Sequence, residues 1–245
     1  MVQALDPDDV ATWSDDVVAL LNEHARDLAP DYEASDLHVP VDDSDVIAAM
    51  HGAPLRAYHC TRLLPSEVEA VLRDGLRALS QQHTDARIWS ARDAGVLSTD
   101  EAARLVAGSV YAMRSEWPDD SLDGRTGAVY GVLGLRPFAT QAHGLDRLLT
   151  LWGGEATYWH ADAPLMARLR SIGTPSIVVL DLDLADDTRT RVGWSLANLL
   201  VGHLAGLDER GGSFRRDGSI PGGAVVGLWH PGSTEYDRFP DLPQG

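Results

Sequence analysis

The sequence predicts an α+β fold. Short apolar runs typical of strands are separated by helical stretches of uneven length, whereas a doubly wound parallel fold repeats strands and helices more regularly. Neither G-x-G-x-x-G nor G-x-x-x-x-G-K-[ST] occurs in the 245 residues. A Rossmann or P-loop nucleotide site is therefore not expected.

The N-terminal region is expected to be helical. An apolar face recurs at helical spacing within residues 6–28, and acidic residues lie at its N-terminal end, where the helix dipole favours them. A connector leads to a short second helix over residues 42–50. We expect residues 1–52 to form a helical extension and residues 53–245 to form the main domain.

A buried strand is predicted over residues 55–60 because the segment is apolar and aromatic. A turn is expected at Thr61 and Arg62. Gly75 is expected to end the helix that follows, because a left-handed residue is needed there and glycine adopts it at little cost. The strand would then end on polar residues that face the start of a helix.

The start of that helix carries two local signals. Pro65 suits the first helical turn, where its missing N–H would lack an intrahelical partner anyway. Ser66 and Glu69 have the spacing of a reciprocal capping pair.

The remaining elements follow from periodicity, caps and glycines. Helices are expected over residues 81–114 (an insert with a break at Gly95 and a cap at Ser98), 144–151, 163–172 and 194–207, and strands over residues 127–135, 176–184 and 224–229. A polar loop is expected over residues 117–125, and the tail from residue 231 is expected to be loosely ordered.

The bulk composition limits the possible partners. The net charge is −17 and every one of the 20 cationic side chains is arginine, so non-specific binding to nucleic acid is not favoured, although it is not excluded. Arg210, Arg215 and Arg216 could contact phosphate, but their glycine-rich setting favours a solvated loop. The single cysteine, Cys60, allows neither an internal disulfide nor a thiolate zinc cluster. It is expected in the core.

Metal and membrane sites are not expected either. Histidines occur in neither H-x-x-x-H nor H-E-x-x-H spacing, so no metal is predicted. No apolar run approaches the roughly 20 residues that span a bilayer. We expect a cytoplasmic protein without a membrane partner.

The segments Tyr58-His59-Cys60-Thr61 and Asp74-Gly75-Leu76 resemble the opening of the ADP-ribosyltransferase fold. In that family a core strand carries a histidine followed by a small polar residue, and a helix ending in Gly-Leu comes next. The resemblance implies a split, mostly antiparallel β core with NAD as substrate. It further implies that His59 and Thr61 hold the adenosine ribose of NAD, next to Gly75 and Leu76.

Glu155 is the candidate catalytic carboxylate. Loss of nicotinamide from NAD passes through an oxocarbenium-like ribosyl cation, which a nearby carboxylate stabilises. Glu155 lies between glycines and aromatic residues in the segment WGGEATYW, and the resemblance implies a glutamate on a later core strand. Trp152, Gly154 and Tyr158 are expected to line this pocket.

The family's His-Tyr-Glu set would be completed by a tyrosine that stacks on nicotinamide. Tyr130 is the first choice because it lies on a predicted core strand, and Tyr111 and Tyr158 are alternatives. Two strands and two helices are expected after Glu155, whereas the family's glutamate usually lies near the end of the domain. The Ser-Thr-Ser strand signature of arginine-specific branches is absent.

The predicted function is transfer of ADP-ribose from NAD to an unidentified acceptor, with release of nicotinamide. Two alternatives stay open. One is a non-catalytic acidic binding, inhibitor or immunity protein, because strong acidity suits contact with a basic partner. The other is an NAD glycohydrolase toxin, in which water is the acceptor.

Overall fold

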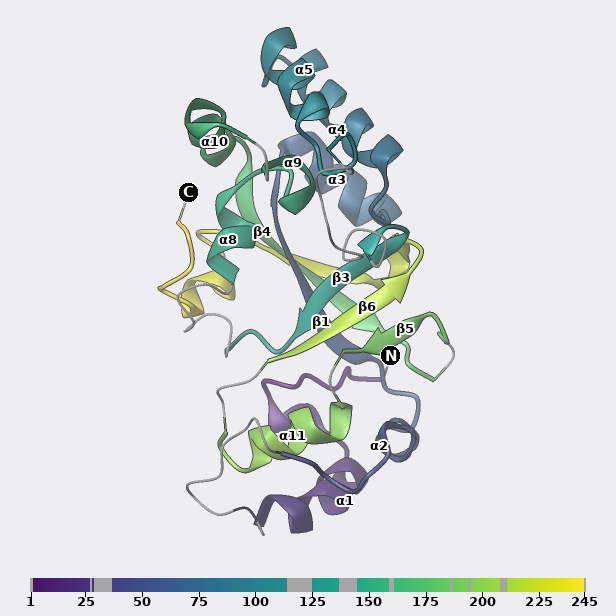
Figure 1. Ribbon diagram of the computed structural model, residues 1–245. Helices are drawn as coiled ribbons and strands as arrows, with labels where there is room; N and C mark the ends of the chain where they lie inside the picture. Colours follow the sequence, from purple (N-terminus) through teal and green to yellow (C-terminus); the bar gives the residue numbers. More distant parts are fainter. Residues whose placement is uncertain are drawn as a thin grey trace. The chain divides into compact units, whose positions relative to one another are not determined.

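The computed structural model describes residues 2–26, 28, 37–113, 125–136, 145–158, 161–185, 187–193, 195–207 and 211–244. The fold is α+β, as predicted, with a mostly antiparallel six-stranded sheet in the order β5-β6-β3-β1-β4-β8 (Figure 1). These strands are β1 (Leu55–Leu63), β3 (Ala128–Leu133), β4 (Thr174–Leu182), β5 (Thr190–Val192), β6 (Gly212–Asp217) and β8 (Val225–Trp229). Counted along the chain, the order is fourth, fifth, second, first, third, sixth, so the first strand lies inside the sheet.

Two further strands pair outside this sheet. β2 (Gly75–Leu76) runs antiparallel to β7 (Ile220–Pro221), and Gly75 is opposite Pro221. Gly75 has φ 88°, and a Cβ atom there would lie 1.9 Å from the carbonyl oxygen of Ile220. Only glycine therefore fits between the end of helix α3 (Pro65–Asp74) and this strand pair.

The chain divides into two compact units. The first comprises Met1–His59, Tyr130–Gln141 and Val179–Arg216, and the second comprises Cys60–Val129, Ala142–Val178 and Asp217–Gly245. Strands β1, β3, β4 and β6 contribute residues to both units. The expected N-terminal extension, residues 1–52, lies within the first unit.

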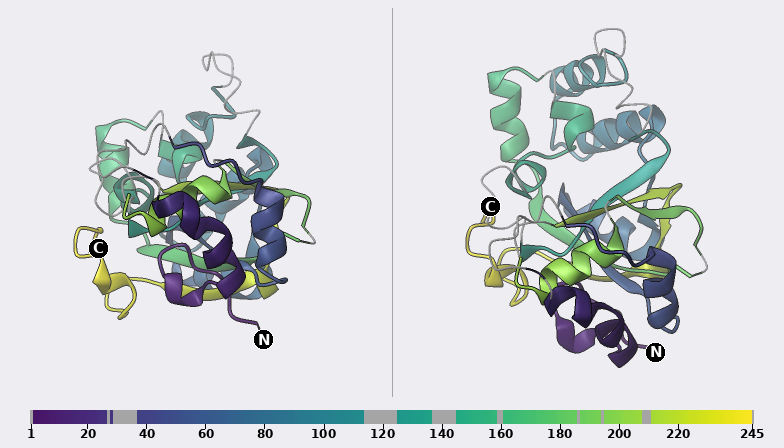
Figure 2. Two further views of the ribbon diagram at one scale, coloured as in Figure 1. Left: turned by 90° about the horizontal axis from the view of Figure 1, so that it is seen from below. Right: turned by 60° about the horizontal axis from the view of Figure 1, so that its bottom comes forward.

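Three helices pack together in the first unit: α1 (Asp15–Arg26), α2 (Asp43–Ala49) and α11 (Leu196–Leu204) (Figures 1 and 2). Helix α11 is apolar and its first seven residues are all buried. The carboxylate of Asp43, in α2, accepts hydrogen bonds from Ser195 Oγ at 2.8 Å and from the Ala197 amide at 3.1 Å. This contact caps α11 and fixes it to α2.

The prediction of a single helix over residues 6–28 is wrong. A short 3₁₀ helix η1 (Val10–Thr12) comes first, and Trp13 after it is extended, with ψ 145°. The Ser14 hydroxyl accepts the Val17 amide at 3.2 Å and thereby starts α1. Serine bonds to the backbone two or three residues ahead more readily than it continues a helix.

The second unit contains helices α3 (Pro65–Asp74), α4 (Gln81–Asp93), α5 (Thr99–Ala107), α8 (Leu145–Thr150), α9 (Glu155–Tyr158) and α10 (Ala163–Arg170). A buried apolar cluster that includes Ile88, Leu105, Trp152 and Leu169 holds α4, α5 and α10 together. The predicted break and cap of the insert are confirmed: Gly95 has φ 72°, and Ser98 and Glu101 form a reciprocal capping box.

Two details around β1 differ from the prediction. The expected turn at Thr61 and Arg62 is wrong, because β1 continues to Leu63 with both residues buried. The expected Ser66–Glu69 capping pair is also wrong. It is the carboxylate of Glu67 that accepts the Leu64 amide, at 2.7 Å.

Two later segments are more ordered than predicted. Arg215 and Arg216 belong to strand β6 rather than to a solvated loop, and Arg216 is buried against Asp187 at 2.6 Å. In the tail, Tyr236 is fully buried in η5 (Tyr236–Arg238), and its hydroxyl donates to the Pro243 carbonyl at 2.7 Å. The expected loop over residues 117–125 and the position of Arg210 lie outside the described residues, apart from residue 125.

Candidate functional site

His59 lies in the interior of strand β1 rather than at its end. Its Nδ1 is 2.7 Å from the backbone carbonyl oxygen of Tyr130, on the neighbouring strand β3. A carbonyl oxygen only accepts, so Nδ1 carries the proton in this bond. In neutral His59 the other ring nitrogen, Nε2, is then the acceptor.

Strand β3 approaches its neighbours closely at Gly131. A Cβ atom at this position would lie 2.2 Å from the Phe214 ring and 2.4 Å from the Tyr58 carbonyl oxygen. The pairing of Tyr58 with Val132 sets the register of β1 and β3. The glycine in this strand therefore serves packing of Phe214 and brings the Tyr130 carbonyl within reach of His59.

The ring of Tyr130 contacts an arginine. Tyr130 is 37% exposed, and the guanidinium of Arg215 in β6 lies 5.8 Å from the centre of its ring. Arg215 is directly opposite Arg191 in the antiparallel β5–β6 ladder. Aromatic and cationic side chains therefore gather on one face of three adjacent strands.

Three of the predicted ribose-binding positions are packed rather than open. Thr61 is 8% exposed and Leu76 is 7% exposed. The backbone of Gly75 is closed in by Ile220 and Pro221. The glycine at position 75 is accounted for by helix termination and strand pairing.

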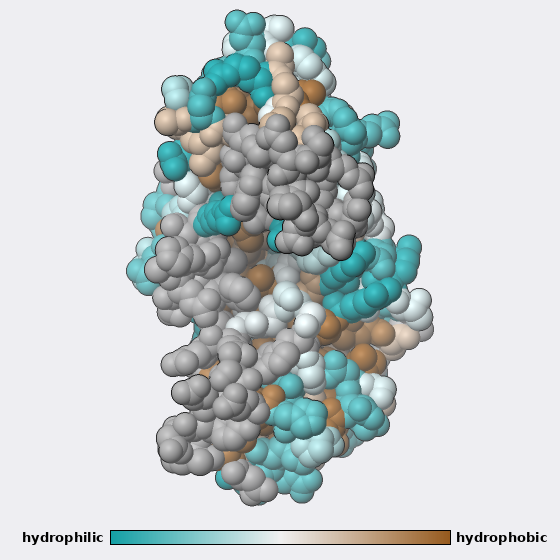
Figure 3. Space-filling view, in the orientation of Figure 1, coloured by the Kyte–Doolittle hydropathy of each residue, from teal (hydrophilic) through white to brown (hydrophobic). Residues whose placement is uncertain are grey.

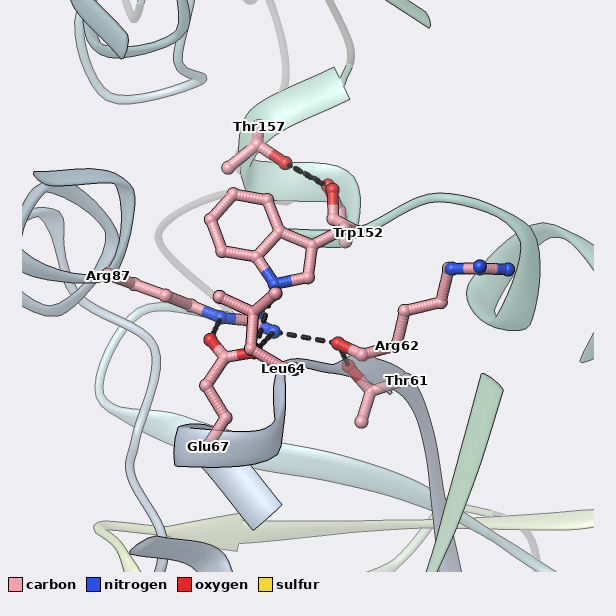
Figure 4. A network of polar contacts seen from close by, with 8 residues as sticks. Thr61, Arg62, Leu64, Glu67, Arg87, Trp152 and Thr157 are labelled. Atoms are coloured by element: carbon pink, nitrogen blue, oxygen red, sulfur yellow. Dashed lines mark hydrogen bonds and ion pairs between the residues drawn. The ribbon is translucent and has the colours of Figure 1, made fainter. Parts of the chain in front are cut away.

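Trp152 is fully buried and belongs to a polar network (Figure 4). Its indole Nε1 donates to Glu67 Oε2 at 2.9 Å, and the guanidinium of Arg87 lies 4.9 Å from the centre of its ring. Arg87 also forms an ion pair with Glu67 and donates to the Arg62 carbonyl at 2.9 Å. The indole is thus a structural anchor for helices α3 and α4.

Four hydrogen bonds hold the Glu67 carboxylate, from the Leu64 amide, from the Trp152 indole and two from Arg87. Burial alone would raise the pKa of Glu67. The charge and hydrogen bonds of Arg87, with those of Leu64 and Trp152, outweigh burial and hold the pKa below its usual value. This carboxylate is ionised and saturated, so we assign it a structural role.

Arg62 extends away from Glu67 in Figure 4. It is 4% exposed and donates to three backbone carbonyls: Ile172 at 2.8 Å, Gly173 at 2.8 Å and Leu149 at 3.2 Å. These carbonyls lie at or just beyond the C-terminal ends of α8 and α10, where the helix dipole is negative. Arg62 therefore caps two helices. No local sequence pattern indicates this role, because a buried arginine is rare.

Glu155 is the first residue of the short helix α9, whereas the family resemblance implies a strand. Gly153 and Gly154 have φ 91° and 65°, and the Thr157 hydroxyl donates to the Gly154 carbonyl at 3.0 Å. These turns start a helix where a strand was expected. Among the described residues, apart from the two chain neighbours, no atom lies within 4 Å of a Cβ built at Gly154, so this part of the structure leaves space beside the backbone there.

The predicted site residues fall into two groups. His59 and Tyr130 belong to the first unit, and the bond between them joins the His59 ring to the backbone of Tyr130, not to its side chain. Thr61, Gly75, Leu76 and the segment from Trp152 to Tyr158 belong to the second unit. The side chains of Glu155 and Tyr158 lie outside what the structure describes. Tyr111, the other alternative, is partly buried against Val110 and Ala156.

Neither the single cysteine nor the surface drawn in Figure 3 indicates a further functional site within the described residues. Burial raises the pKa of Cys60 to about 12, so the thiol is protonated and inert at neutral pH. Hydrophilic and hydrophobic residues are interspersed on the face drawn in Figure 3. Within the described ranges, no three His, Cys, Asp or Glu residues cluster as metal ligands, and no helix is both long and apolar enough to cross a bilayer.

The sequence did not single out Arg191, and it indicated that Arg215 belongs to a solvated loop. The available signal was a cluster of arginines in a strongly acidic chain, and its place in the fold became clear only from strands β5 and β6.

Comparison of the chain with protein-family models, curated proteins and solved structures found no match.

Proposed function

We propose that this chain binds NAD and transfers its ADP-ribose to an acceptor, releasing nicotinamide. One observation carries the proposal: His59 lies on an interior strand, and its Nδ1 is fixed by the Tyr130 carbonyl at 2.7 Å. A histidine held in this way has one tautomer and one ring orientation before any ligand arrives. The α+β fold with an interior first strand is compatible with the split core that the resemblance implies.

His59 would bind the adenosine ribose. The bond from Nδ1 to the Tyr130 carbonyl fixes the orientation of the imidazole ring that would contact the ribose. Tyr130, more than a third exposed, would stack on the nicotinamide ring. Because the imidazole ring is already held in place, ordering it costs less conformational entropy when a ligand binds.

Glu155 would stabilise the ribosyl cation in this proposal. The C1′–N bond of NAD breaks and its electron pair leaves with nicotinamide. A bond then forms between C1′ and an oxygen or nitrogen of the acceptor, whose proton passes to solvent. A carboxylate next to C1′ stabilises the positive charge of the transition state. The open backbone at Gly154 allows a ligand to approach.

The test is NAD binding measured by titration calorimetry. We expect His59→Ala to lower affinity roughly tenfold, the value of a lost hydrogen bond that orients a ligand. His38→Ala is the control, since His38 is exposed and also in the first unit. Equal affinities of the two variants, with unchanged melting temperatures, would count against the role of His59.

The same titration separates the alternatives. If the wild-type chain does not bind NAD, the acidic binding or inhibitor protein becomes the leading interpretation. If NAD is consumed and free ADP-ribose accumulates without any labelled acceptor, the chain is a glycohydrolase.

A further inference from the structure

Strand β8 is the last strand in the order of the six-stranded sheet, so within the sheet it pairs with β4 alone. Half of the backbone N–H and C=O groups of such an edge strand point away from the sheet and can pair with another strand. For Val226, Gly227 and Leu228, the described part of the chain supplies no backbone hydrogen bond besides those of the sheet. β8 therefore presents an edge that a further strand can extend.

This edge carries no charge. Residues 218–234 contain no Asp, Glu, Arg or Lys, although 23% of the whole chain is charged. Natural proteins commonly protect a sheet edge with charged side chains, a proline or a bulge. The sequence of β8, VVGLW, contains neither a charge nor a proline. It lacks these two features that keep the strands of separate molecules from pairing.

Two exposed apolar side chains accompany this edge. Leu72 in α3 is 49% exposed and Val226 in β8 is 50% exposed. Both belong to the second unit, and α3 contacts β8. Gly222, which leads into β8, lies so close to α3 that a Cβ atom there would clash with the Arg73 carbonyl oxygen. Apolar side chains are thus exposed on two elements that pack against each other.

The charges near Leu72 cancel. Glu69, Arg73, Asp74 and Arg77 are all exposed in this region. Arg73 pairs with Asp74 at 2.8 Å, and the charges of Glu69 and Arg77 act on the same pair. Two negative and two positive charges leave the end of α3 neutral, whereas the whole chain carries −17. Because like-charged molecules repel each other, two copies of this chain approach most easily at a neutral region.

We infer that β8 pairs with β8 of a second copy of this chain, and that Leu72 and Val226 become buried in the interface. In a two-fold dimer both copies present the same surface, so the two β8 strands run antiparallel. Pairing centred on Gly227 places Val226 opposite the partner subunit's Leu228. A basic partner fits this region less well, because complementarity to an acidic chain needs exposed acidic charge at the contact. The inference does not depend on the proposed NAD chemistry.

The experiment is sedimentation equilibrium of the full chain over a series of concentrations. We expect a dimer that becomes tighter with added salt, because salt screens the repulsion between two chains of charge −17. Hydrogen exchange of the β8 amides should slow as the dimer forms, since strand pairing protects them. A wild-type chain that stays monomeric would overturn the inference and leave the edge to a strand of another protein. A dimer that forms without protecting β8 would overturn it as well.

Three variants locate the interface. Val226→Lys should weaken the dimer at least roughly a hundredfold, because it places one lysine from each copy in the paired edge. Leu72→Ala should weaken it roughly tenfold through lost apolar burial. Val2→Lys is the matched control: Val2 is 67% exposed, lies in the first unit, and the substitution adds the same charge.

Circular dichroism confirms that each variant is folded, and the dissociation constants are then compared. Val2→Lys should leave the dimer unchanged. Equal dissociation constants for Val226→Lys and Val2→Lys would overturn the inference, because the substitution would then act through net charge and not through the β8 edge.

Discussion

The indole Nε1 of Trp152 donates a 2.9 Å hydrogen bond to the carboxylate of Glu67, 85 residues earlier in the chain. This bond joins the start of α3 to the segment that precedes α9, and Arg87 of α4 closes the network. The aromatic residue predicted to line a pocket is thus part of the second unit's core.

Trp152→Phe should destabilise the chain by about 2 kcal/mol, because it removes the donor from a buried, ionised carboxylate. The change in unfolding free energy is measured by urea denaturation. Trp89→Phe is the control, since Trp89 is partly buried and stacks with Arg92 at 4.8 Å without a hydrogen bond to Glu67. A smaller loss in Trp152→Phe than in Trp89→Phe would contradict the role of the network.

Stability should also depend on pH through Glu67. Its pKa in the folded chain is lowered, so its contribution is fully present above its unfolded value of about 4.3. The contribution is lost as the pH falls through the lower folded pKa. Melting curves of wild type and Glu67→Gln should therefore converge as the pH is lowered from 7 towards 3. A constant difference across this range would contradict the assignment.

Arg62→Met should cost roughly 3–5 kcal/mol, because it leaves three carbonyls, two of them in buried hydrogen bonds, without this donor. Arg62→Lys should recover little, since an ammonium cannot reach Ile172, Gly173 and Leu149 with a planar fork. Both variants are compared with wild type by urea denaturation. Full stability of Arg62→Lys would show that charge alone, and not the fork, holds the two helix ends.

Gly75→Ala and Gly95→Ala form a matched pair. Both glycines have positive φ, 88° and 72°. A Cβ atom at Gly75 would clash with Ile220, whereas a Cβ atom at Gly95 would have no atom of the described residues within 4 Å, its chain neighbours apart. Gly95→Ala should cost about 1–2 kcal/mol from backbone strain alone. Gly75→Ala should cost clearly more, roughly 3 kcal/mol or above. Equal costs would mean that β2 and β7 separate readily to admit the methyl group.

Much of the architecture could be predicted from local patterns. Pro65, Gly75, Gly95 and the Ser98 cap mark element boundaries because their effect depends on the adjacent backbone alone. The α+β class and the main strands followed from apolar runs. These signals are local and do not require tertiary contacts.

What escaped prediction depends on distant partners. Strand β1 continues through Arg62 instead of ending in a turn there. Three carbonyls more than 80 residues away accept hydrogen bonds from Arg62 and make its burial favourable. Strand β6 looked like a solvated arginine loop, since nothing local shows that Asp187 neutralises Arg216. Glu155 was expected on a strand, but Thr157 bonds back to Gly154 and starts a helix.

The measurement that tests the central claim most directly is nicotinamide release from NAD by the purified chain, with a crude lysate as the source of acceptors. We predict release by the wild type and at least a roughly hundredfold lower rate for Glu155→Gln, the scale of losing an electrostatic stabiliser of the transition state. Equal rates in the two proteins, or no release by the wild type in the presence of lysate, would contradict the proposed NAD chemistry.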